Sequence, residues 1–270
     1  MIRKLFLCVL LQYLSSCDSE QSFNDLDIFG GKKVISEISE SKYATIGLFS
    51  RSIAYAGSQF AEIEGSATLI SPKVAVGAAH TCLSFDPHYA LAGPTTDLEK
   101  VEYVRISSCI THSDYQGDLG EEAGYSSLPS NDIALFYLAD ELVGLNPAEL
   151  APLHEISLPL AVSIVGFGSF AGQFDLNYNE ELAEWESFQP FHLRRAESFI
   201  SEHWSGASHF KDGPNPGIGS CQGDSGGSIY LEHGEQAYLL AMPVAGPACS
   251  DGVGYNVDLR AYRSWIFDRI

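Results

Sequence analysis

A short glycine-rich segment near the C-terminal end of the sequence has the composition of a nucleophile loop. It reads Cys-Gln-Gly-Asp-Ser-Gly-Gly over residues 221–227, so Ser225 is flanked by residues with little side-chain bulk. A serine in such a setting can expose its hydroxyl while nearby backbone N–H groups point at the charge that develops on an acyl oxygen. Glycine-rich turns are also common for structural reasons, so the segment needs chemical partners elsewhere in the chain.

Two upstream segments supply the base and the acid that an activated serine requires. Residues 74–80 form an apolar, strand-like run that ends in His80, and residues 131–138 place Asp132 just before a second apolar run. Histidine is the usual general base for a serine, and a carboxylate can hold the imidazole ring in the required tautomer. Taken singly, a histidine at a strand end or an aspartate in a turn is commonly structural. The ordered set of three predicts an active site.

These segments together resemble the chymotrypsin-like (trypsin-fold) serine peptidases. The order histidine, aspartate, serine belongs to that fold, because unrelated folds carry the same residues in other orders. The resemblance covers approximately residues 28–270. It rests on Ala-Ala-His at 78–80, Asn-Asp-Ile-Ala-Leu at 131–135, Gly-Asp-Ser-Gly-Gly at 223–227, Ile-Phe-Gly-Gly at 28–31, Gly-Phe-Gly at 166–168 and Tyr-Arg-Ser-Trp-Ile at 262–266.

The resemblance implies a role for each residue of the set. Ser225 attacks a carbonyl carbon, His80 takes its proton and delivers it to the leaving group, and Asp132 orients the imidazole. The backbone N–H groups of Gly223 and Ser225 form the oxyanion hole. The implied function is a serine endopeptidase that hydrolyses protein or peptide substrates through an acyl-enzyme. The alternative is a catalytically silent homologue that binds a protein partner, since a fold alone does not fix a function.

The order of residues argues against a second hydrolase fold. Residues 223–227 also fit the G-x-S-x-G nucleophile elbow, which needs a helix after the serine and both the acid and the histidine downstream. His233 is the only histidine that follows Ser225. It lies too close to Ser225 to leave room for the intervening strands and acid.

The composition is that of a globular, β-rich protein. Hydrophobic residues make up 45% of the 270 residues, which is ample for a core. Glycine and proline clusters separate short apolar runs that we expect to be strands. These runs cover residues 43–49, 67–70, 101–106 and 163–167.

The resemblance also implies an all-β architecture of two antiparallel six-stranded barrels, with the active site in the cleft between them. We expect residues 28–148 to form the first barrel, which carries His80 and Asp132, and residues 149–258 to form the second, which carries Ser225. A seam near residues 146–154, where two prolines interrupt regular structure, joins the barrels. Residues 259–270 have apolar positions at helical spacing and are expected to form a closing C-terminal helix.

The start of the sequence has the features of an export signal. Arg3 and Lys4 precede an apolar run over residues 5–11 that is too short to span a bilayer. Leu-Ser-Ser-Cys at residues 14–17 resembles a bacterial lipobox, in which Cys17 carries lipid; an ordinary signal peptide is the alternative. We therefore expect a signal peptide over residues 1–17 and a pro-segment over 18–27. The protein would be bacterial and periplasmic, extracellular, or tethered at the cell surface.

The cysteine count is consistent with a lipid anchor and two disulfides. Loss of the signal removes one of six cysteines, and lipid on Cys17 would leave an even four. The resemblance implies a bridge between Cys221 and Cys249. The family usually has a cysteine directly after the histidine, whereas here Cys82 follows one residue later. Cys82–Cys109 is therefore predicted by elimination, in an oxidising compartment.

The resemblance further implies that the enzyme is made as a zymogen. In the family, a cut before an Ile-Val-Gly-Gly-like segment frees an ammonium that pairs with the aspartate beside the nucleophile; here these groups are Ile28 and Asp224. Asp27 stands where a trypsin-cut zymogen has arginine or lysine. Either a peptidase with acidic or relaxed preference cuts there, or activation proceeds differently. A cut at this bond would release the protein from lipid on Cys17.

The residues expected to form the primary specificity pocket follow from alignment through Cys221. They are Gly219 at the base, with Ser220, Gln222, Val244 and Gly246 around it. Trypsin-like enzymes have an aspartate at the base position, which pairs with arginine or lysine. Since this chain has glycine there, we expect an apolar side chain at P1, the substrate residue before the scissile bond.

The far wall of the pocket is less well defined by the sequence. It aligns with either Gly252 or Gly254, and Asp251 lies between the pocket segments. A basic preference would return by another route if that carboxylate reached the pocket.

The net charge of −20 argues against nucleic acid or anionic lipid surfaces as partners, because binding to phosphate depends on lysine and arginine. No cofactor is expected. The sequence has no H-E-x-x-H motif or paired C-x-x-C motif, so we expect no catalytic metal. The expected partners are protein or peptide substrates and an activating peptidase, and the protein is expected to be a monomer.

Overall fold

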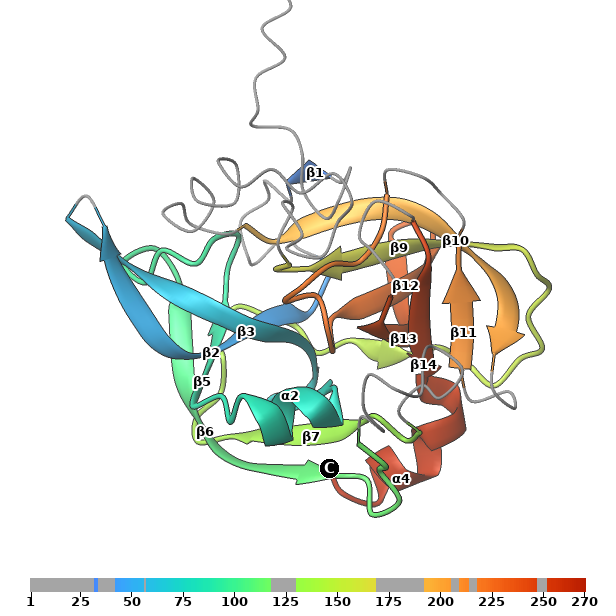
Figure 1. Ribbon diagram of the computed structural model, residues 1–270, viewed down its shortest axis with the longest axis horizontal. Coiled ribbons are helices and arrows are strands. Elements are labelled where there is room, and N and C mark those ends of the chain that lie inside the picture. Colours follow the sequence, from blue (N-terminus) through green and yellow to red (C-terminus); the bar gives the residue numbers. More distant parts are fainter. Residues whose placement is uncertain are drawn as a thin grey trace, which may run out of the picture.

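The strands of the protein form two antiparallel β-barrels that lie side by side (Figure 1). They are seen in a computed structural model that describes residues 32–33, 42–55, 57–117, 130–168, 192–204, 209–213, 218–246 and 252–270. This arrangement confirms the predicted fold class.

The first barrel is closed and is built from the N-terminal half of the described chain. Its strands, in spatial order, are β2 (Thr45–Tyr55), β3 (Ser58–Ser71), β4 (Val74–Gly77), β7 (Ala134–Leu138), β6 (Glu102–Thr111) and β5 (Tyr89–Ala92). All four residues of β4 are buried, and so are four of the five in β7. These two short apolar strands pair with each other. The pairing places the end of β4, just before His80, beside the start of β7.

The second barrel closes through the pairing of β9 with β10. Its strands, in spatial order, are β10 (Arg194–Trp204), β11 (His209–Asp212), β14 (Gly254–Asp258), β13 (Gln236–Ala245), β12 (Ser228–His233) and β9 (Leu160–Gly166). Two short strands extend this sheet: β1 (Lys32–Lys33) pairs with β10, and β8 (Glu149–Leu150) runs parallel to β13. The expected first-barrel segment 28–148 thus contains two residues, those of β1, that pair with the second barrel.

The helical segments are short. Helix α2 (Ala79–Ser84) follows β4, so the strand-like run over residues 74–80 ends at Gly77 and His80 lies in the first turn of a helix. The C-terminal segment begins as the 3₁₀ helix η5 (Leu259–Tyr262), whose N-terminus is capped by the side chain of Asp258, and continues as α4 (Arg263–Phe267). The closing helix is therefore shorter than the predicted span of 259–270.

The two barrels share a core and a polar interface. One apolar cluster joins Val76 and Leu135 of the first barrel to Val165 and Tyr230 of the second. Beside it, the hydroxyl of Ser228 lies 2.6 Å from Thr45 Oγ1 and 2.5 Å from Thr68 Oγ1, all three being buried. Buried hydrogen-bonded groups fix a single relative placement of the parts that they join, because any shift leaves them unsatisfied. The interface therefore sets the geometry of whatever lies between the barrels.

The seam between the barrels is tied to both of them. Ala148 N donates to Leu69 O of the first barrel at 2.8 Å, and Ala151 N donates to Leu239 O of the second at 2.8 Å.

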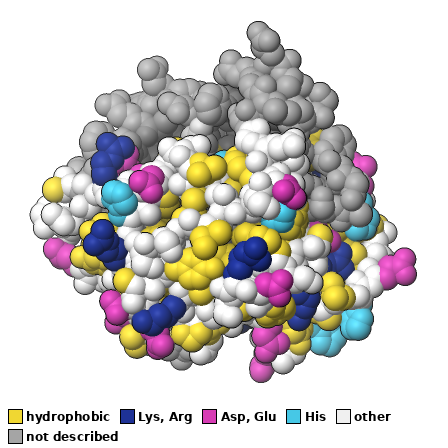
Figure 2. Space-filling view, turned by 90° about the horizontal axis from the view of Figure 1, so that it is seen from below, with side chains coloured by type: hydrophobic (Ala, Val, Ile, Leu, Met, Phe, Trp, Pro, Cys, Tyr) yellow, Lys and Arg dark blue, Asp and Glu magenta, His cyan; other side chains and the backbone are white. Residues whose placement is uncertain are grey.

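Figure 2 shows one face of the molecule, on which acidic, basic and hydrophobic side chains are interspersed. No helix in the described part of the chain is long and apolar enough to cross a membrane.

Candidate active site

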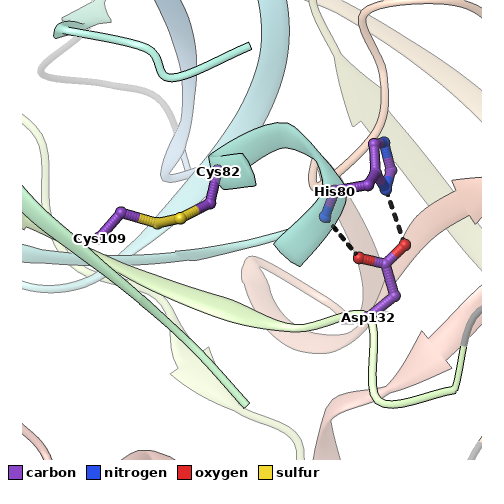
Figure 3. Close-up of a disulfide and its surroundings, with 4 residues drawn as sticks. All are labelled: His80, Cys82, Cys109 and Asp132. Atoms are coloured by element: carbon purple, nitrogen blue, oxygen red, sulfur yellow. Dashed lines mark hydrogen bonds and ion pairs between the residues drawn. A yellow bond between two sulfur atoms is a disulfide. The ribbon is translucent and has the colours of Figure 1, made fainter. Parts of the chain in front are cut away.

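His80 and Asp132 lie against each other in the first barrel (Figure 3). The Nδ1 atom of His80 is 2.7 Å from Asp132 Oδ2, and the backbone N–H of His80 donates to Asp132 Oδ1 at 2.9 Å. The aspartate is fully buried, whereas the histidine side chain is 24% exposed. Both carboxylate oxygens thus hold the histidine, one through its ring and one through its backbone. The bond from Nδ1–H leaves Nε2 as the ring nitrogen that can accept a proton.

The turn that carries Asp132 is held from the far end of the chain. Asn131, directly before it, has a φ of 55°, a left-handed conformation that asparagine tolerates better than most residues. Its side-chain oxygen accepts a hydrogen bond from Tyr262 Oη at 3.0 Å, and its amide donates to Asp114 O at 3.0 Å. The left-handed turn aims the carboxylate at His80, and the C-terminal 3₁₀ helix secures that turn.

A disulfide anchors the helix that carries His80. Cys82 and Cys109 are joined, with their Cα atoms 6.2 Å apart, so α2 is linked covalently to β6 (Figure 3). This confirms the predicted pairing. Cys221 is also disulfide-bonded; its predicted partner, Cys249, lies outside the described residues.

The loop that carries Ser225 leaves two backbone N–H groups available. Asp224 N donates to Cys221 O, Gly226 N to Pro243 O and Gly227 N to Asp224 O, at 2.8–3.0 Å. Within the described part of the chain, no acceptor bonds the N–H of Gly223 or of Ser225. Gly223 and Gly226 have φ values of 88° and 80°, so the loop needs glycine at both positions. The two available groups are those expected to form the oxyanion hole.

The same loop packs tightly against the first barrel beside α2. A Cβ atom at Gly226 would lie 2.7 Å from Ala78 N and 3.1 Å from a Gly77 backbone atom, so only glycine fits there. Ser66 N donates to Ser225 O at 2.9 Å. The loop therefore adjoins the residues that lead into His80. Among the described residues, no hydrogen bond joins Ser225 Oγ to His80 Nε2; such bonds are often long before a substrate binds.

The hydroxyl of Ser66 connects the nucleophile loop to its support. It donates to Gly223 O at 2.8 Å and accepts a hydrogen bond from Phe167 N at 3.1 Å. Ser66 is fully buried on β3 of the first barrel, while Gly223 and Phe167 belong to the second. This residue was not singled out from the sequence, where a serine inside a strand carries no signal of such a role.

The carboxylate of Asp224 is buried behind the nucleophile. Its Oδ1 accepts a hydrogen bond from Gly168 N and its Oδ2 one from Cys221 N, both at 2.8 Å. A side chain at Gly166 or Gly168 would collide with this carboxylate, which accounts for the glycines of the Gly-Phe-Gly segment. Arg194 is the only buried basic residue in the described part of the chain. It lies opposite Gly166 in the β9–β10 register.

The predicted pocket residues near this loop differ in their exposure. Gly219 and Val244 are buried, Ser220 is partly buried and Gln222 is exposed. Gly246 adjoins the strand β14, since a Cβ atom there would lie 3.9 Å from the Cα of Gly254. Gly254, rather than Gly252, therefore lies beside Gly246. Ile28, Cys17 and Asp251 lie outside the described residues, as do Cys249 and the segment 34–41 that precedes the first barrel.

No group of three or more histidine, cysteine or acidic side chains in the described ranges could hold a metal ion. The arrangement of the site is instead that of a general base, its orienting acid and a serine loop with two unbonded N–H groups. Two β-barrels with this constellation between them define the class of chymotrypsin-like serine peptidase folds.

Comparisons with known proteins agree with this class. The family model described as Trypsin matches residues 49–266. The fold is similar to that of neuropsin, a serine protease expressed in the limbic system of mouse brain, with a TM-score of 0.64 and 19% sequence identity; the match covers 88% of this chain and 97% of that one. No curated protein matches the sequence significantly. The chain belongs to the trypsin family.

Proposed function

We propose that this protein is a serine endopeptidase whose catalytic residues are Ser225, His80 and Asp132. The observation that carries the proposal is the hydrogen-bonded His80–Asp132 pair beside a serine loop that leaves the N–H groups of Gly223 and Ser225 unbonded. A turn with only a structural role would not require two N–H groups without acceptors beside an oriented histidine.

The chemistry follows from the geometry. His80 Nδ1–H donates to Asp132, so Nε2 can accept the proton of Ser225 as the serine oxygen attacks a peptide carbonyl. The charge that develops on the carbonyl oxygen is stabilised by the N–H groups of Gly223 and Ser225. The imidazolium, stabilised by Asp132, returns the proton to the leaving amine. A water molecule then repeats the sequence on the acyl-enzyme and frees Ser225.

Maturation is proposed to involve export and a cut before Ile28. The disulfides are compatible with export, because such bonds persist in oxidising compartments. The start of the described chain also supports the cut, because Lys33 of β1 pairs in register with Arg194, next to the glycines that pack on Asp224. Ile28 is four residues before β1, within about 14 Å of it when extended. A pair between its ammonium and Asp224, which the family's activation requires, is consistent with this arrangement.

The test is intact mass of the mature protein before and after reaction with a fluorophosphonate probe. We expect one adduct, absent from Ser225→Ala, on a chain that begins at Ile28. A chain that begins at Ile28 and takes no adduct would favour the alternative, a silent homologue that binds a protein partner. An active chain that still begins at Cys17 would contradict the proposed cut, and the mass of Cys17 itself would report the proposed lipid.

A further inference from the structure

A buried carboxylate lies at the end of the second barrel where β11 meets β14. Asp212, the last residue of β11, pairs in register with Gly254, the first residue of β14. A Cβ atom at Gly254 would lie 2.5 Å from Asp212 Oδ1 and 3.2 Å from Ser220 Oγ. The carboxylate and the hydroxyl therefore converge on the bare face of one glycine.

This place coincides with the predicted specificity pocket. Ser220 is five residues before the nucleophile and directly follows Gly219, the expected base of the pocket. Gly246, expected on an open wall, directly follows strand β13 and adjoins Gly254. Asp212 thus lies beside Ser220, assigned to the pocket from the sequence, and Gly254, one of the two candidates for its far wall. It comes from a strand that the alignment did not include.

The polar groups here have unused capacity to accept hydrogen bonds. Asp212 is fully buried, and its Oδ1 accepts a bond from Asn256 Nδ2 at 3.0 Å. Within the described part of the chain, neither Asp212 Oδ2 nor Asn256 Oδ1 has a hydrogen-bond partner. Buried oxygens without donors are costly and uncommon in folded proteins. The Asp212 carboxylate lies beside the Ser220 hydroxyl, and a group rich in N–H donors would satisfy the two acceptors that lack a donor.

The charge at this place is also uncompensated. No lysine, arginine or histidine in the described residues forms an ion pair with Asp212. Burial raises the pKa of Asp212, and the Asn256 amide and the N–H groups of Asp212 and Gly254 only partly oppose that rise. A positive charge brought next to the carboxylate would favour its ionised form and would recover the energy that burial costs.

We propose that Asp212 is a specificity-determining residue that receives a cationic P1 side chain, lysine or arginine. The inference rests on the proposed function, because it assigns the substrate class of the same site. It replaces the apolar preference expected from Gly219, since the carboxylate that pairs with the substrate comes from β11. Gly246 and Gly254 carry no side chain that could cover these acceptors.

A binding measurement tests the pocket without requiring catalysis. The Ser225→Ala protein would be titrated calorimetrically with benzamidine, an aromatic amidinium, and with benzamide, its neutral counterpart. We expect benzamidine to bind and benzamide not to bind. Asp212→Asn should weaken benzamidine binding about 100-fold, the loss typical of removing one partner of a buried charge pair, whereas Asp251→Asn should leave it unchanged. Equal binding by the Asp212→Asn protein, or a loss only in Asp251→Asn, would overturn the assignment.

Substrate kinetics separate the inference from the proposed function. In the mature enzyme, kcat/KM should favour peptides with lysine or arginine at P1 over leucine or phenylalanine by about 100-fold, and Asp212→Asn should remove that preference. The Asp212→Asn variant should be labelled by a fluorophosphonate at a rate near that of wild type. This labelling would also show that the variant is folded. A labelled wild-type enzyme that prefers leucine would end the Asp212 assignment and leave the peptidase intact. If the protein binds benzamidine through Asp212 but is never labelled, the Asp212 assignment stands and the proposed peptidase activity fails.

Discussion

Arg194 stands opposite Gly166 on paired strands, on the side of the sheet where the carboxylate of Asp224 lies. Residues in register share a face, so the absence of a side chain at Gly166 makes room for Asp224 while Arg194 adds a positive charge nearby. Burial lowers the pKa of Arg194 to about 9, and the charge of Asp224 opposes that shift. The guanidinium therefore remains charged at neutral pH.

Replacing Arg194 should impair the nucleophile loop. In Arg194→Met, Asp224 loses the only buried basic side chain of the described residues, and we expect the free energy of unfolding to fall by about 3 kcal/mol. Labelling of Ser225 by a fluorophosphonate should slow at least tenfold, because Asp224 supports the loop that carries it. Arg195→Met is the matched control, since Arg195 bonds Glu232 instead. Equal labelling rates in the two variants would show that Arg194 has no part in positioning the loop.

The hydroxyl of Ser66 should matter more for reactivity than for stability. Ser66→Ala leaves the buried N–H of Phe167 without its acceptor and frees the carbonyl of Gly223, at a cost of about 1–3 kcal/mol. Labelling of Ser225 should slow as the oxyanion loop loosens. Ser228→Ala removes a comparable buried hydroxyl that directly follows that loop but bonds Thr45 and Thr68 of the first barrel. It should destabilise the protein to a similar degree without changing the labelling rate; stopped-flow labelling and denaturant unfolding measure the two effects.

The disulfide between Cys82 and Cys109 should contribute about 3.5 kcal/mol of stability, since it closes a loop of 27 residues. The double variant Cys82→Ser/Cys109→Ser avoids an unpaired thiol, and urea unfolding without reductant measures the loss. We also expect the midpoint of inactivation by heat to fall with the unfolding midpoint. An unchanged unfolding midpoint would mean that α2 is held by packing alone.

Glu232 should make the protein sensitive to acid. Burial by itself would raise its pKa, but hydrogen bonds from Lys42, Ser163 and Tyr43 and the charge of Arg195 outweigh burial and lower the pKa to about 2. A carboxyl whose pKa is depressed in the folded state contributes stability above its ordinary value near 4.5 and loses it as the pH falls towards 2. The side chain is 22% exposed, so we expect a contribution of about 2 kcal/mol.

Unfolding of wild type and Glu232→Gln across this range tests the prediction. The difference between their free energies of unfolding should be constant above pH 5 and should shrink steadily between pH 4.5 and pH 2. A difference that does not change with pH would show that the glutamate acts by packing rather than by its charge.

The order of the three motifs was enough to establish the resemblance to the chymotrypsin-like family, and that resemblance implied the two barrels. The pairing of Cys82 with Cys109 followed from counting cysteines. Local detail was harder: Ala-Ala-His suits the end of a strand as well as the first turn of a helix, and tertiary packing makes it the latter.

Asp212 and Arg194 could not be found from the sequence. A Lys-Asp-Gly stretch has the composition of a surface turn, and two adjacent arginines do not indicate which one faces inward. That choice depends on strand register, since Arg194 lies opposite Gly166 and Arg195 opposite Val165. Register is set by pairing partners that are distant in the chain, so the burial of these charges becomes visible only in the folded protein.

The hydrogen bond between Tyr262 and Asn131 makes completion of the candidate site depend on a residue that is synthesised late. A ribosome makes Asp132 long before Tyr262, which is 131 residues after Asn131. During that interval the growing chain already contains His80 and its acid, but the turn that aims the acid lacks its support. The second barrel and Ser225 also come later. On the proposed function, the catalytic site is therefore complete only once translation has passed Tyr262.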